Sequence, residues 1–507
     1  MYIKNFTIYF AKSELCNTLN IIKTRIKIMT SYKVKKYLKE DIVAEVPGSK
    51  SMTNRALLLA VMADGTSRLE GAAFSEDSVH FLKALESMGF KVEADEKRCT
   101  VIIEGHGGNI PNKTAGIYVG SAGTAARFLT AFTAMGDGEY VLDSSDQMRK
   151  RPMRELLEAL ESLGAEFTWL GEEYTFPMKV RGILYGRNPV GDVKEKAEIY
   201  SDEPEKNRTD ISGKVKLNND KADEPKKKSS NIERINEPKA VALNIDRSSQ
   251  FLSALLMVLP IAFDDVTIKM TGTREARSYV EMTEQMMKQF GHKGVEKLEN
   301  DSYRVRGGDY IARDYDIEPD VSAACYFYAL AAATGKRAMV KRMRKESLQG
   351  DMKFISLLEK MGCTVSWECD GRQNLWLKGP DGKLKGMEVK MSDFSDQALT
   401  LAAIAPFADS EVTITGIAHI RGQESDRIKV IVDELAKMGI LCNELPDGVK
   451  IHPGTPKNTN IETYNDHRVA MSFAVTGLAG DGMTILNPMC CKKTFAGFFD
   501  EIDRLEE

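Results

Sequence analysis

Apolar and polar positions follow two different periods near the start of the chain, and together they predict a strand and then a buried helix. Residues 42–46 alternate with a period of two, which is typical of a half-buried strand. Residues 56–63 form an unbroken apolar run, Ala-Leu-Leu-Leu-Ala-Val-Met-Ala, which predicts a buried helix. Pro47 and Gly48 separate the two segments, because both residue types end regular structure.

The combination of helix and strand recurs along the chain. Five helical stretches end in similar phrases, of the type Leu-x-x-Met-Gly, whose glycines are Gly89, Gly164, Gly291, Gly362 and Gly439. A glycine at this place suits a helix C-cap in the left-handed conformation. The glycines lie 71–79 residues apart once residues 191–238 are removed from the longest interval. Such a period indicates repeated supersecondary units, and we expect six α/β units, of which the last lacks the phrase.

Two segments do not fit this pattern. Residues 1–28 carry five basic side chains against one acidic one, Glu14. Such a leader is either an organellar transit peptide or sequence upstream of the true start, and we favour the second, with Met29 as the start. Residues 191–238 contain 23 charged residues among 48 and one aromatic residue, Tyr200. This segment cannot bury enough apolar surface to offset the entropy of ordering, so we predict a disordered insertion.

Length and composition limit the class of protein. A chain of 507 residues exceeds a single core, which predicts two large domains. A net charge of −4 gives no general affinity for nucleic acid. The longest nearly apolar run, residues 251–263, is too short to span a bilayer. Eight cysteines without metal-ligand spacing indicate a reducing, cytoplasmic compartment rather than a disulfide framework.

Candidate chemistry lies in polar loops that precede apolar helices. In residues 47–55, Lys50 supplies a point charge and Arg55 a bidentate fork, at a helix start that favours anions. Before a helix expected to hold Pro152 in its first turn, three cations oppose the helix dipole, which a bound anion would explain. One such loop is ordinary capping, whereas their number indicates anionic substrates. Besides residues 47–55, these loops are residues 120–127, 149–153 (the loop with the three cations), 247–251, 421–427, 464–468 and 492–495. Asp396 precedes a further helix.

These motifs, in this order, resemble the 5-enolpyruvylshikimate-3-phosphate (EPSP) synthase family, the 3-phosphoshikimate 1-carboxyvinyltransferases. The resemblance covers roughly residues 40–500 without the insertion and rests on residues 47–55, 122–125, 151–153, 248–251, 464–468 and 493–495. It implies a two-domain α/β fold, an inside-out α/β barrel of six repeated units with three per domain. The first strand of this fold belongs to the C-terminal domain. The resemblance therefore implies an N-terminal domain of residues 48–316 and a C-terminal domain of residues 29–47 plus 317–507.

The resemblance also implies an activity. The enolpyruvyl group of phosphoenolpyruvate is transferred to the 5-hydroxyl of shikimate-3-phosphate, and phosphate is released, by addition and elimination through a tetrahedral intermediate. This step serves chorismate and aromatic amino acid biosynthesis, and the family is the target of glyphosate. No metal or organic cofactor, no nucleic acid and no membrane is expected, and the protein is expected to be a cytoplasmic monomer. Both substrates are anions, which explains the many cationic loops.

By the same resemblance, roles fall on residues of the motifs. Asp396 is the expected base for the 5-hydroxyl, Glu424 the expected acid for the methylene carbon, and Lys50 a third catalytic group. Shikimate-3-phosphate is expected to contact Lys50, Ser51, Arg55, Ser248, Ser249, Gln250, Tyr279, Asp396, His419 and Gln423. Phosphoenolpyruvate is expected to contact Lys50, Gly123, Thr124, Arg149, Arg151, Gln250, Arg427, Arg468 and Lys493, with the choice between Arg149 and Arg151 open.

Several positions depart from the family pattern. Gln147 stands where many members have arginine, so an arginine at 149 or 151 must compensate. Ala276 replaces a serine that helps to bind the shikimate phosphate, and the side chain at 277 or 278 could substitute. Gln423 replaces a frequent lysine, and a neutral amide cannot act as a cation or a base. These departures concern individual roles and the response to glyphosate, not the family.

Two other interpretations are possible. UDP-N-acetylglucosamine enolpyruvyl transferases share the fold and the chemistry but typically carry a reactive cysteine on a mobile loop of the N-terminal half. Here only Cys16 and Cys99 precede residue 325; Cys16 lies in the leader, and Cys99 is predicted to lie in a strand. A non-catalytic anion-binding relative would account for the departures, but the retained carboxylates and cations of the motifs argue against it.

Overall fold

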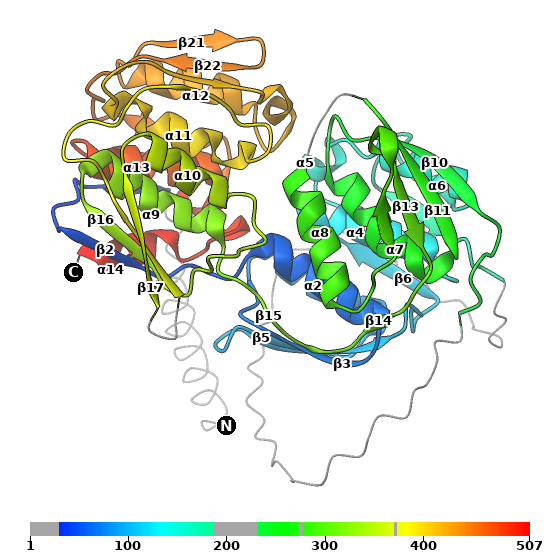
Figure 1. Ribbon diagram of the computed structural model, residues 1–507. Helices are drawn as coiled ribbons and strands as arrows, with labels where there is room; N and C mark the ends of the chain where they lie inside the picture. Colours follow the sequence, from blue (N-terminus) through cyan, green and yellow to red (C-terminus); the bar gives the residue numbers. More distant parts are fainter. Residues whose placement is uncertain (1–29, 187–231, 273–276, 370–372, 507) are drawn as a thin grey trace, which may run out of the picture.

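The computed structural model describes residues 30–186, 232–272, 277–369 and 373–506. The leader, residues 191–231 of the predicted insertion, and Ala276 lie outside the described residues. The described chain forms two halves that meet where α2 (Lys50–Met62) begins (Figure 1). No helix among the described residues is both long enough and apolar enough to cross a membrane.

Within the described residues, the strands form six sheets with one shared pattern of pairing. In five of them a parallel pair is extended by an antiparallel hairpin, as in the order β6-β7-β9-β8. The sixth sheet, β1-β24-β23, keeps the parallel pair and one antiparallel strand. Three sheets belong to the first half: β3 (Ala63–Glu70), β4 (Val92–Asp95), β5 (Thr100–His106), β14 (Tyr310–Ile311) and β15 (Asp314–Asp316); β6 (Thr114–Tyr118), β7 (Glu139–Asp143), β8 (Glu166–Trp169) and β9 (Met178–Arg181); β10 (Lys239–Asn244), β11 (Asp265–Thr271), β12 (Val295–Lys297) and β13 (Tyr303–Arg306).

The second half takes its first two strands from the beginning of the chain. β2 pairs in parallel with β16, and β1 pairs with β24, so both lie in sheets of the C-terminal half. The three sheets consist of β2 (Asp41–Ala44), β16 (Arg337–Val340), β17 (Thr364–Cys369) and β18 (Gln373–Lys378); β19 (Glu388–Lys390), β20 (Val412–Thr415), β21 (Cys442–Leu445) and β22 (Gly448–Ile451); β1 (Ser31–Val34), β23 (Asn460–Ile461) and β24 (Met483–Leu486).

Helices of two kinds accompany these sheets. Apolar helices fill the centre of each half: α2, α4 (Gly123–Met135) and α7 (Gln250–Ala262) in the first, and α9 (Val321–Thr334), α11 (Ala398–Ile404) and α13 (His467–Ala479) in the second. Each amphipathic helix has one face of apolar residues, which is buried, and an opposite face that is exposed to water. They are α3 (Glu76–Ser87), α6 (Arg154–Leu163), α8 (Arg277–Gln289), α10 (Met352–Lys360), α12 (Arg427–Lys437) and α14 (Phe498–Glu506).

The buried side chains form two separate hydrophobic cores. One contains residues between 52 and 317, and the other contains residues 32–44 and 321–505. Two segments of the chain, residues 47–49 and 318–320, cross side by side between the cores. Ser49 N–H donates to the Glu318 carbonyl at 2.8 Å, and Asp320 N–H donates to the Pro47 carbonyl at 2.8 Å. A Cβ atom on Gly48 would lie 1.7 Å from the Gly71 carbonyl oxygen, so only glycine fits this crossing.

The recurring glycine phrase is confirmed as a helix end. Gly89, Gly164, Gly291, Gly362 and Gly439 all have positive φ, between 78° and 110°. Glycine adopts this left-handed conformation without a steric penalty, which is why it closes each helix. The predicted strand before Pro47 and the predicted helix over 56–63 are also present, as β2 and α2.

Three local predictions are wrong. Cys99 lies in the turn between β4 and β5, with φ of 51°, and not in a strand. Pro152 precedes α6, which begins at Arg154 after Met153 as N-cap. The end of the predicted insertion is ordered, because Ile235 N–H donates to the Ala262 carbonyl at 2.8 Å and thereby joins the end of α7.

Candidate active site

An open cavity lies where the two halves meet, with about 910 Å³ of empty space, part of which is open to solvent. Most of the residues predicted for the site line it, although they come from eight different segments of the chain. Hydroxyls, amides and cations dominate the lining, as a site for anions requires. The predicted residues among the lining are Lys50, Ser51, Arg55, Thr124, Arg151, Ser248, Ser249, Gln250, Tyr279, Asp396, Gln423, Glu424, Arg427 and Arg468.

Three of the four remaining predicted residues lie beside this lining. The Lys493 ammonium, at the end of η5 (Pro488–Lys493), lies 2.9 Å from Glu424 Oε1. Gly123 begins α4, and a Cβ atom there would lie 2.5 Å from Arg127 Nη1 and 2.8 Å from Arg151 Nη1. His419 Nε2 lies 2.8 Å from the Ser395 hydroxyl, which lines the cavity.

The fourth predicted residue, Arg149, is placed differently. It ends α5 (Asp146–Arg149) and forms an ion pair with Asp143 at 2.9 Å, outside the lining of the cavity. Arg151 lines the cavity and lies 3.5 Å from Glu424. The structure therefore brings Arg151, and not Arg149, to the other site residues.

Arg55 is a buried cation on α2 whose described partners are all neutral. Its Nε donates to the Thr283 hydroxyl at 2.8 Å, and Nη1 donates to the Ser51 carbonyl at 3.0 Å. Burial lowers the pKa of Arg55 to about 10, and the nearby Tyr279 offsets this only in part. A buried cation is costly unless it is paired, so the surroundings of Arg55 suit an anionic ligand.

Arg427, the first residue of α12, is the centre of a buried network of ion pairs. Its Nε donates to Asp466 Oδ2 at 2.8 Å and its Nη2 donates to Glu424 Oε2 at 3.1 Å. Burial lowers the pKa of Arg427, but Asp466 and Glu424 outweigh it and raise the pKa above its usual value. Gln423 also accepts a hydrogen bond from Arg427, so the amide at this position orients a cation instead of supplying one.

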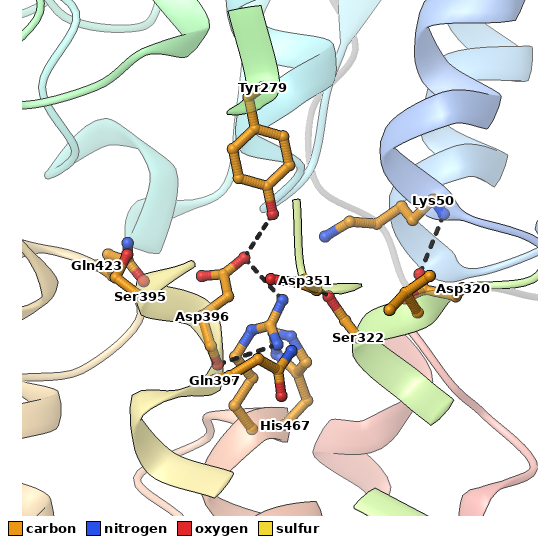
Figure 2. A network of polar contacts seen from close by, with 12 residues as sticks. Lys50, Tyr279, Asp320, Ser322, Asp351, Ser395, Asp396, Gln397, Gln423 and His467 are labelled. Atoms are coloured by element: carbon orange, nitrogen blue, oxygen red, sulfur yellow. Dashed lines mark hydrogen bonds and ion pairs between the residues drawn. The ribbon is translucent and has the colours of Figure 1, made fainter. Parts of the chain in front are cut away.

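Asp396, in η2 (Ser395–Gln397), lies between cations and a phenol. The Tyr279 hydroxyl donates to its Oδ2 at 2.9 Å (Figure 2), and Arg468 Nη2 donates to the same oxygen at 2.8 Å. Burial raises the pKa of Asp396, but Arg468, Arg427 and Tyr279 outweigh it and hold the pKa below its usual value. Asp396 is therefore a carboxylate at neutral pH.

Glu424, just after η4 (Ala418–Gly422), is the second carboxylate of the cavity. Three cations surround it: Lys493 at 2.9 Å, Arg427 at 3.1 Å and Arg151 at 3.5 Å. Burial raises its pKa, but Lys493, Arg151 and Arg427 hold the pKa well below its usual value. Glu424 is therefore ionised, and it lies among the cations that the resemblance assigns to phosphoenolpyruvate.

A second cavity adjoins the first, and both include Lys50, Ser51, Tyr279 and Arg468 in their linings. Lys50 Nζ forms an ion pair with Asp77 at 3.0 Å. Two further buried carboxylates, Asp320 and Asp351, line only the second cavity. Asp320 caps α9 by accepting from Ala323 N–H at 3.1 Å, and Ser322 donates to Asp351 (Figure 2).

Asp351 is expected to make stability depend on pH. Burial and the charge of Asp396 raise its pKa to about 6. The unfolded chain has a pKa of about 3.9 here, so the folded state loses stability as pH rises through about 4 to 6. Asp351→Asn is expected to stabilise the protein at pH 8, by on the order of 2 kcal/mol, and by roughly half as much at pH 5.

Thermal unfolding of both proteins at pH 5 and pH 8 measures this difference. The exposed Asp381, which pairs with Lys378, provides the matched control, and Asp381→Asn is expected to change stability little at either pH. A destabilising effect of Asp351→Asn that is larger at pH 8 than at pH 5 would contradict the expectation.

The sequence motifs give no role to five further residues in or beside the two cavities, Arg127, Asp77, Asp320, Asp351 and His467. Asp320 and Asp351 stand directly before helices and Asp77 lies in the first turn of one, which is the local pattern of ordinary helix starts. Arg127 did carry a signal, because it is a charged residue within the otherwise apolar α4. A cation that interrupts a buried helix needs a partner, and the same reasoning applies to Arg55 in α2.

The cysteine that could have supported a sugar-nucleotide transferase lies away from this cavity. Cys99 lies in the β4–β5 turn and lines neither cavity, and partial burial of its thiol raises its pKa. A raised pKa lowers the fraction of reactive thiolate. In the described part of the chain, no group of three or more histidine, cysteine, aspartate and glutamate side chains could hold a metal ion.

Fold and cavity define an α/β protein with a cation-rich cavity where its two halves meet, and comparisons with known proteins identify its family. The family model described as EPSP synthase (3-phosphoshikimate 1-carboxyvinyltransferase) matches residues 33–203 and 216–502. The 3-phosphoshikimate 1-carboxyvinyltransferase of Trichormus variabilis is 40% identical over 460 residues, which cover 90% of this chain and 95% of that protein.

Two further similarities agree with this match. The enzyme of the same name from Escherichia coli O127:H6 is 33% identical over 488 residues, covering 94% of this chain and all of that protein. The fold resembles a solved EPSP synthase from Acinetobacter baumannii, with a TM-score of 0.69 at 24% identity, over 94% of this chain and 98% of the other. The chain belongs to the EPSP synthase family, and the family and enzyme class predicted from the sequence are confirmed.

Proposed function

We propose that the cavity transfers the enolpyruvyl group of phosphoenolpyruvate to the 5-hydroxyl of shikimate-3-phosphate and releases phosphate. One observation carries the assignment of roles: Asp396 and Glu424 line one cavity and share Arg427, but their other cations differ, with Arg468 beside Asp396 and Lys493 and Arg151 beside Glu424. Paired carboxylates can serve as base and acid when their surroundings differ and each can be tuned by a different ligand group.

Shikimate-3-phosphate occupies the side of the cavity formed by α2, α7 and α8. The guanidinium of Arg55, which lacks an anionic partner among the described residues, receives its carboxylate. The hydroxyls of Ser248 and Ser249 hold its phosphate beside the start of α7. The remaining contacts come from Lys50, Ser51, Gln250, Tyr279, Asp396, His419 and Gln423.

Phosphoenolpyruvate occupies the side around Glu424. Arg427 and Arg468 receive its carboxylate, whereas Arg151 and Lys493 receive its phosphate, with Gly123 and Thr124 at the start of α4 beside it. We assign this role to Arg151 rather than Arg149 because Arg149 pairs with Asp143. Each charge-assisted hydrogen bond contributes roughly 1.5–3 kcal/mol, and several are needed to hold two anions together.

The reaction needs Asp396 as a base from the outset. Its pKa lies below the usual value because Arg468, Arg427 and Tyr279 outweigh the effect of burial. Asp396 accepts the proton of the 5-hydroxyl as that oxygen bonds to C2 of phosphoenolpyruvate. Loss of a proton from C3 and of phosphate from C2 then restores the double bond of the product.

Glu424 must gain a proton before it can protonate C3, and the binding of phosphoenolpyruvate provides the reason. In this structure burial, which raises its pKa, is outweighed by Lys493, Arg151 and Arg427. A bound carboxylate and phosphate draw these three cations toward the substrate, so their stabilisation of the Glu424 carboxylate weakens and its pKa rises. Substrate binding thus converts an ion-pair partner into an acid.

The architecture supports this arrangement of two substrates. We infer an inside-out barrel of six repeated units, three in each of two domains, from the shared pairing pattern of the sheets. The two cores support domains of residues 48–316 and of residues 29–47 plus 317–507, except that Ile317 packs in the first core. The cytoplasmic location and the monomeric state stay predictions.

Phosphate release from phosphoenolpyruvate tests the function directly. The protein is incubated with phosphoenolpyruvate and either shikimate-3-phosphate or UDP-N-acetylglucosamine. Release only with shikimate-3-phosphate is expected. Release only with the sugar nucleotide would assign the chain to the sister activity, and binding of shikimate-3-phosphate without release would support a non-catalytic relative.

A further inference from the structure

Two consecutive residues before α13, Tyr464 and Asn465, adopt a backbone conformation that their side chains disfavour. Their φ angles are 53° and 55°, in the left-handed region that glycine occupies without a steric penalty. Residues other than glycine carry strain there, and the strain persists only where the surrounding structure holds it. This left-handed turn leads directly into Asp466, His467 and Arg468, so whatever holds the turn also sets where α13 begins.

A buried carboxylate from the neighbouring helix holds the left-handed turn. Glu434, on α12, is fully buried, and its Oε1 accepts from the Tyr464 hydroxyl at 2.8 Å. Its Oε2 accepts from Glu462 N–H at 3.3 Å. Lys437 Nζ, one turn further along α12, pairs with Oε1 at 2.7 Å and offsets part of the cost of burying the charge. Glu434 therefore ties the chain before α13 to the middle of α12.

The residues after the left-handed turn connect α13 to the cavity. Asp466 N–H donates to the Thr463 carbonyl at 2.8 Å, and the Asp466 carboxylate accepts from Arg427 Nε at 2.8 Å. Arg468 N–H donates to Asp466 Oδ1 at 3.0 Å, and the Arg468 guanidinium lies 2.8 Å from Asp396. A shift of the turn would therefore move both guanidinium groups that are assigned to the carboxylate of phosphoenolpyruvate.

A second tie joins the left-handed turn to the segment that carries Lys493. Asn487 Nδ2 donates to Asn465 Oδ1 at 3.3 Å, and Asn487 itself has a φ of 49° as the N-cap of η5. Lys493 ends η5, and its ammonium lies 2.9 Å from Glu424. The turn is thus linked to both elements, α13 and η5, that bring C-terminal cations to the site.

We propose that Glu434 is a positioning residue of the transfer site, which holds the left-handed turn and thereby aims two guanidinium groups at the carboxylate of phosphoenolpyruvate. This inference rests on the proposed function. Glu434 and Tyr464 line neither cavity, so they act through the start of α13 and not by touching a ligand. Shikimate-3-phosphate is assigned mainly to α2, α7 and α8 of the first half, so its affinity is expected to depend little on the turn.

Glu434→Ala and Tyr464→Phe test this role from the two sides of one hydrogen bond. Glu434→Ala is expected to lower kcat/KM for phosphoenolpyruvate roughly 10- to 100-fold, because a misplacement of about 1 Å costs up to about 100-fold. Tyr464→Phe removes only a hydroxyl from a ring that is 37% exposed, which preserves the fold, and is expected to lower kcat/KM about 3- to 10-fold. The Kd for shikimate-3-phosphate is expected to change less than about twofold in both variants. Glu434→Gln, which keeps one acceptor oxygen, is expected to restore part of the loss.

The preceding residue of α12 provides the matched control. Asp433 pairs with Lys429 at 3.3 Å, and Asp433→Ala is expected to leave both constants unchanged. A purely structural role of Glu434 would weaken the protein toward both substrates alike. Equal losses for phosphoenolpyruvate and shikimate-3-phosphate would therefore overturn the proposal, as would a kcat/KM within about twofold of the wild type in Glu434→Ala and Tyr464→Phe.

Hydrogen exchange of the amides of residues 462–468 separates this proposal from the proposed function, because it needs no turnover. Glu434→Ala is expected to speed exchange there, and Asp433→Ala is not. Faster exchange together with weaker calorimetric binding of phosphoenolpyruvate, in a protein that shows no turnover, would refute the function and keep the positioning role. An active enzyme whose Glu434→Ala variant exchanges like the wild type would refute only the positioning role.

Discussion

Glu424→Gln is expected to lower kcat by about 10²–10⁴-fold, because an amide cannot give a proton to C3 of phosphoenolpyruvate. The same change is expected to preserve or tighten the binding of phosphoenolpyruvate in the presence of shikimate-3-phosphate. The reason is that Lys493, Arg427 and Arg151, which lie 2.9, 3.1 and 3.5 Å from the carboxylate, lose an internal competitor. Phosphate release gives kcat, and calorimetry gives the Kd.

A lower kcat together with unchanged or tighter binding of phosphoenolpyruvate distinguishes an acid from a group that only binds the substrate. Glu411, half-exposed and paired with Lys450, is the matched control, and Glu411→Gln is expected to leave kcat and the Kd unchanged. A kcat within tenfold of the wild type would remove Glu424 from the proton transfer. A loss of phosphoenolpyruvate binding that accompanies the loss of kcat would make Glu424 a binding group instead.

Local patterns in the sequence predicted those features that local physics determines. The five glycines of the repeated phrase close helices in the left-handed conformation, since this depends on one residue and its immediate neighbours. The apolar runs became central helices because a helix without a polar face has to be buried. The family motifs then placed most of the site residues in one cavity.

Local sequence patterns could not predict the contacts between distant segments of the chain. Tyr279 and Asp396 are 117 positions apart in the chain, and their 2.9 Å hydrogen bond depends on how the two halves meet. Arg149 and Arg151 have the same local character, yet one pairs with Asp143 and the other reaches Glu424. Only the direction of each side chain separates them, and this direction is set by the short α5 and the turn after it.

Buried carboxylates near the crossing were missed for a related reason. Asp320 caps α9, and on the sequence nothing distinguishes it from an N-cap at the surface. Asp351 likewise precedes α10 as an N-cap would, although it lies beside Asp396 and carries a raised pKa. Their significance comes from the cavity that they share with Lys50 and Arg468, which no single segment encodes.

Asp396→Asn is expected to lower kcat by about 10²–10⁴-fold, because an amide cannot accept the proton of the 5-hydroxyl. It is also expected to destabilise the protein at neutral pH, since Arg468, 9% exposed, loses the carboxylate that lies 2.8 Å from it. Although burial raises the pKa of Asp396, Arg468 and Arg427 bring it below its usual value. A carboxyl of this kind adds stability above its unfolded pKa of about 3.9, and that stability is lost as pH falls through the folded value.

The destabilisation by Asp396→Asn should therefore be larger at pH 7 than at pH 4, as thermal unfolding at the two values measures. Tyr279→Phe provides the comparison, because it removes the hydroxyl that donates to Asp396 at 2.9 Å and keeps the carboxylate. Its kcat is expected to fall far less than that of Asp396→Asn. If both variants lost the same activity, the base would be the Tyr279–Asp396 pair acting together, and if Asp396→Asn kept its activity, another group would have to take the proton.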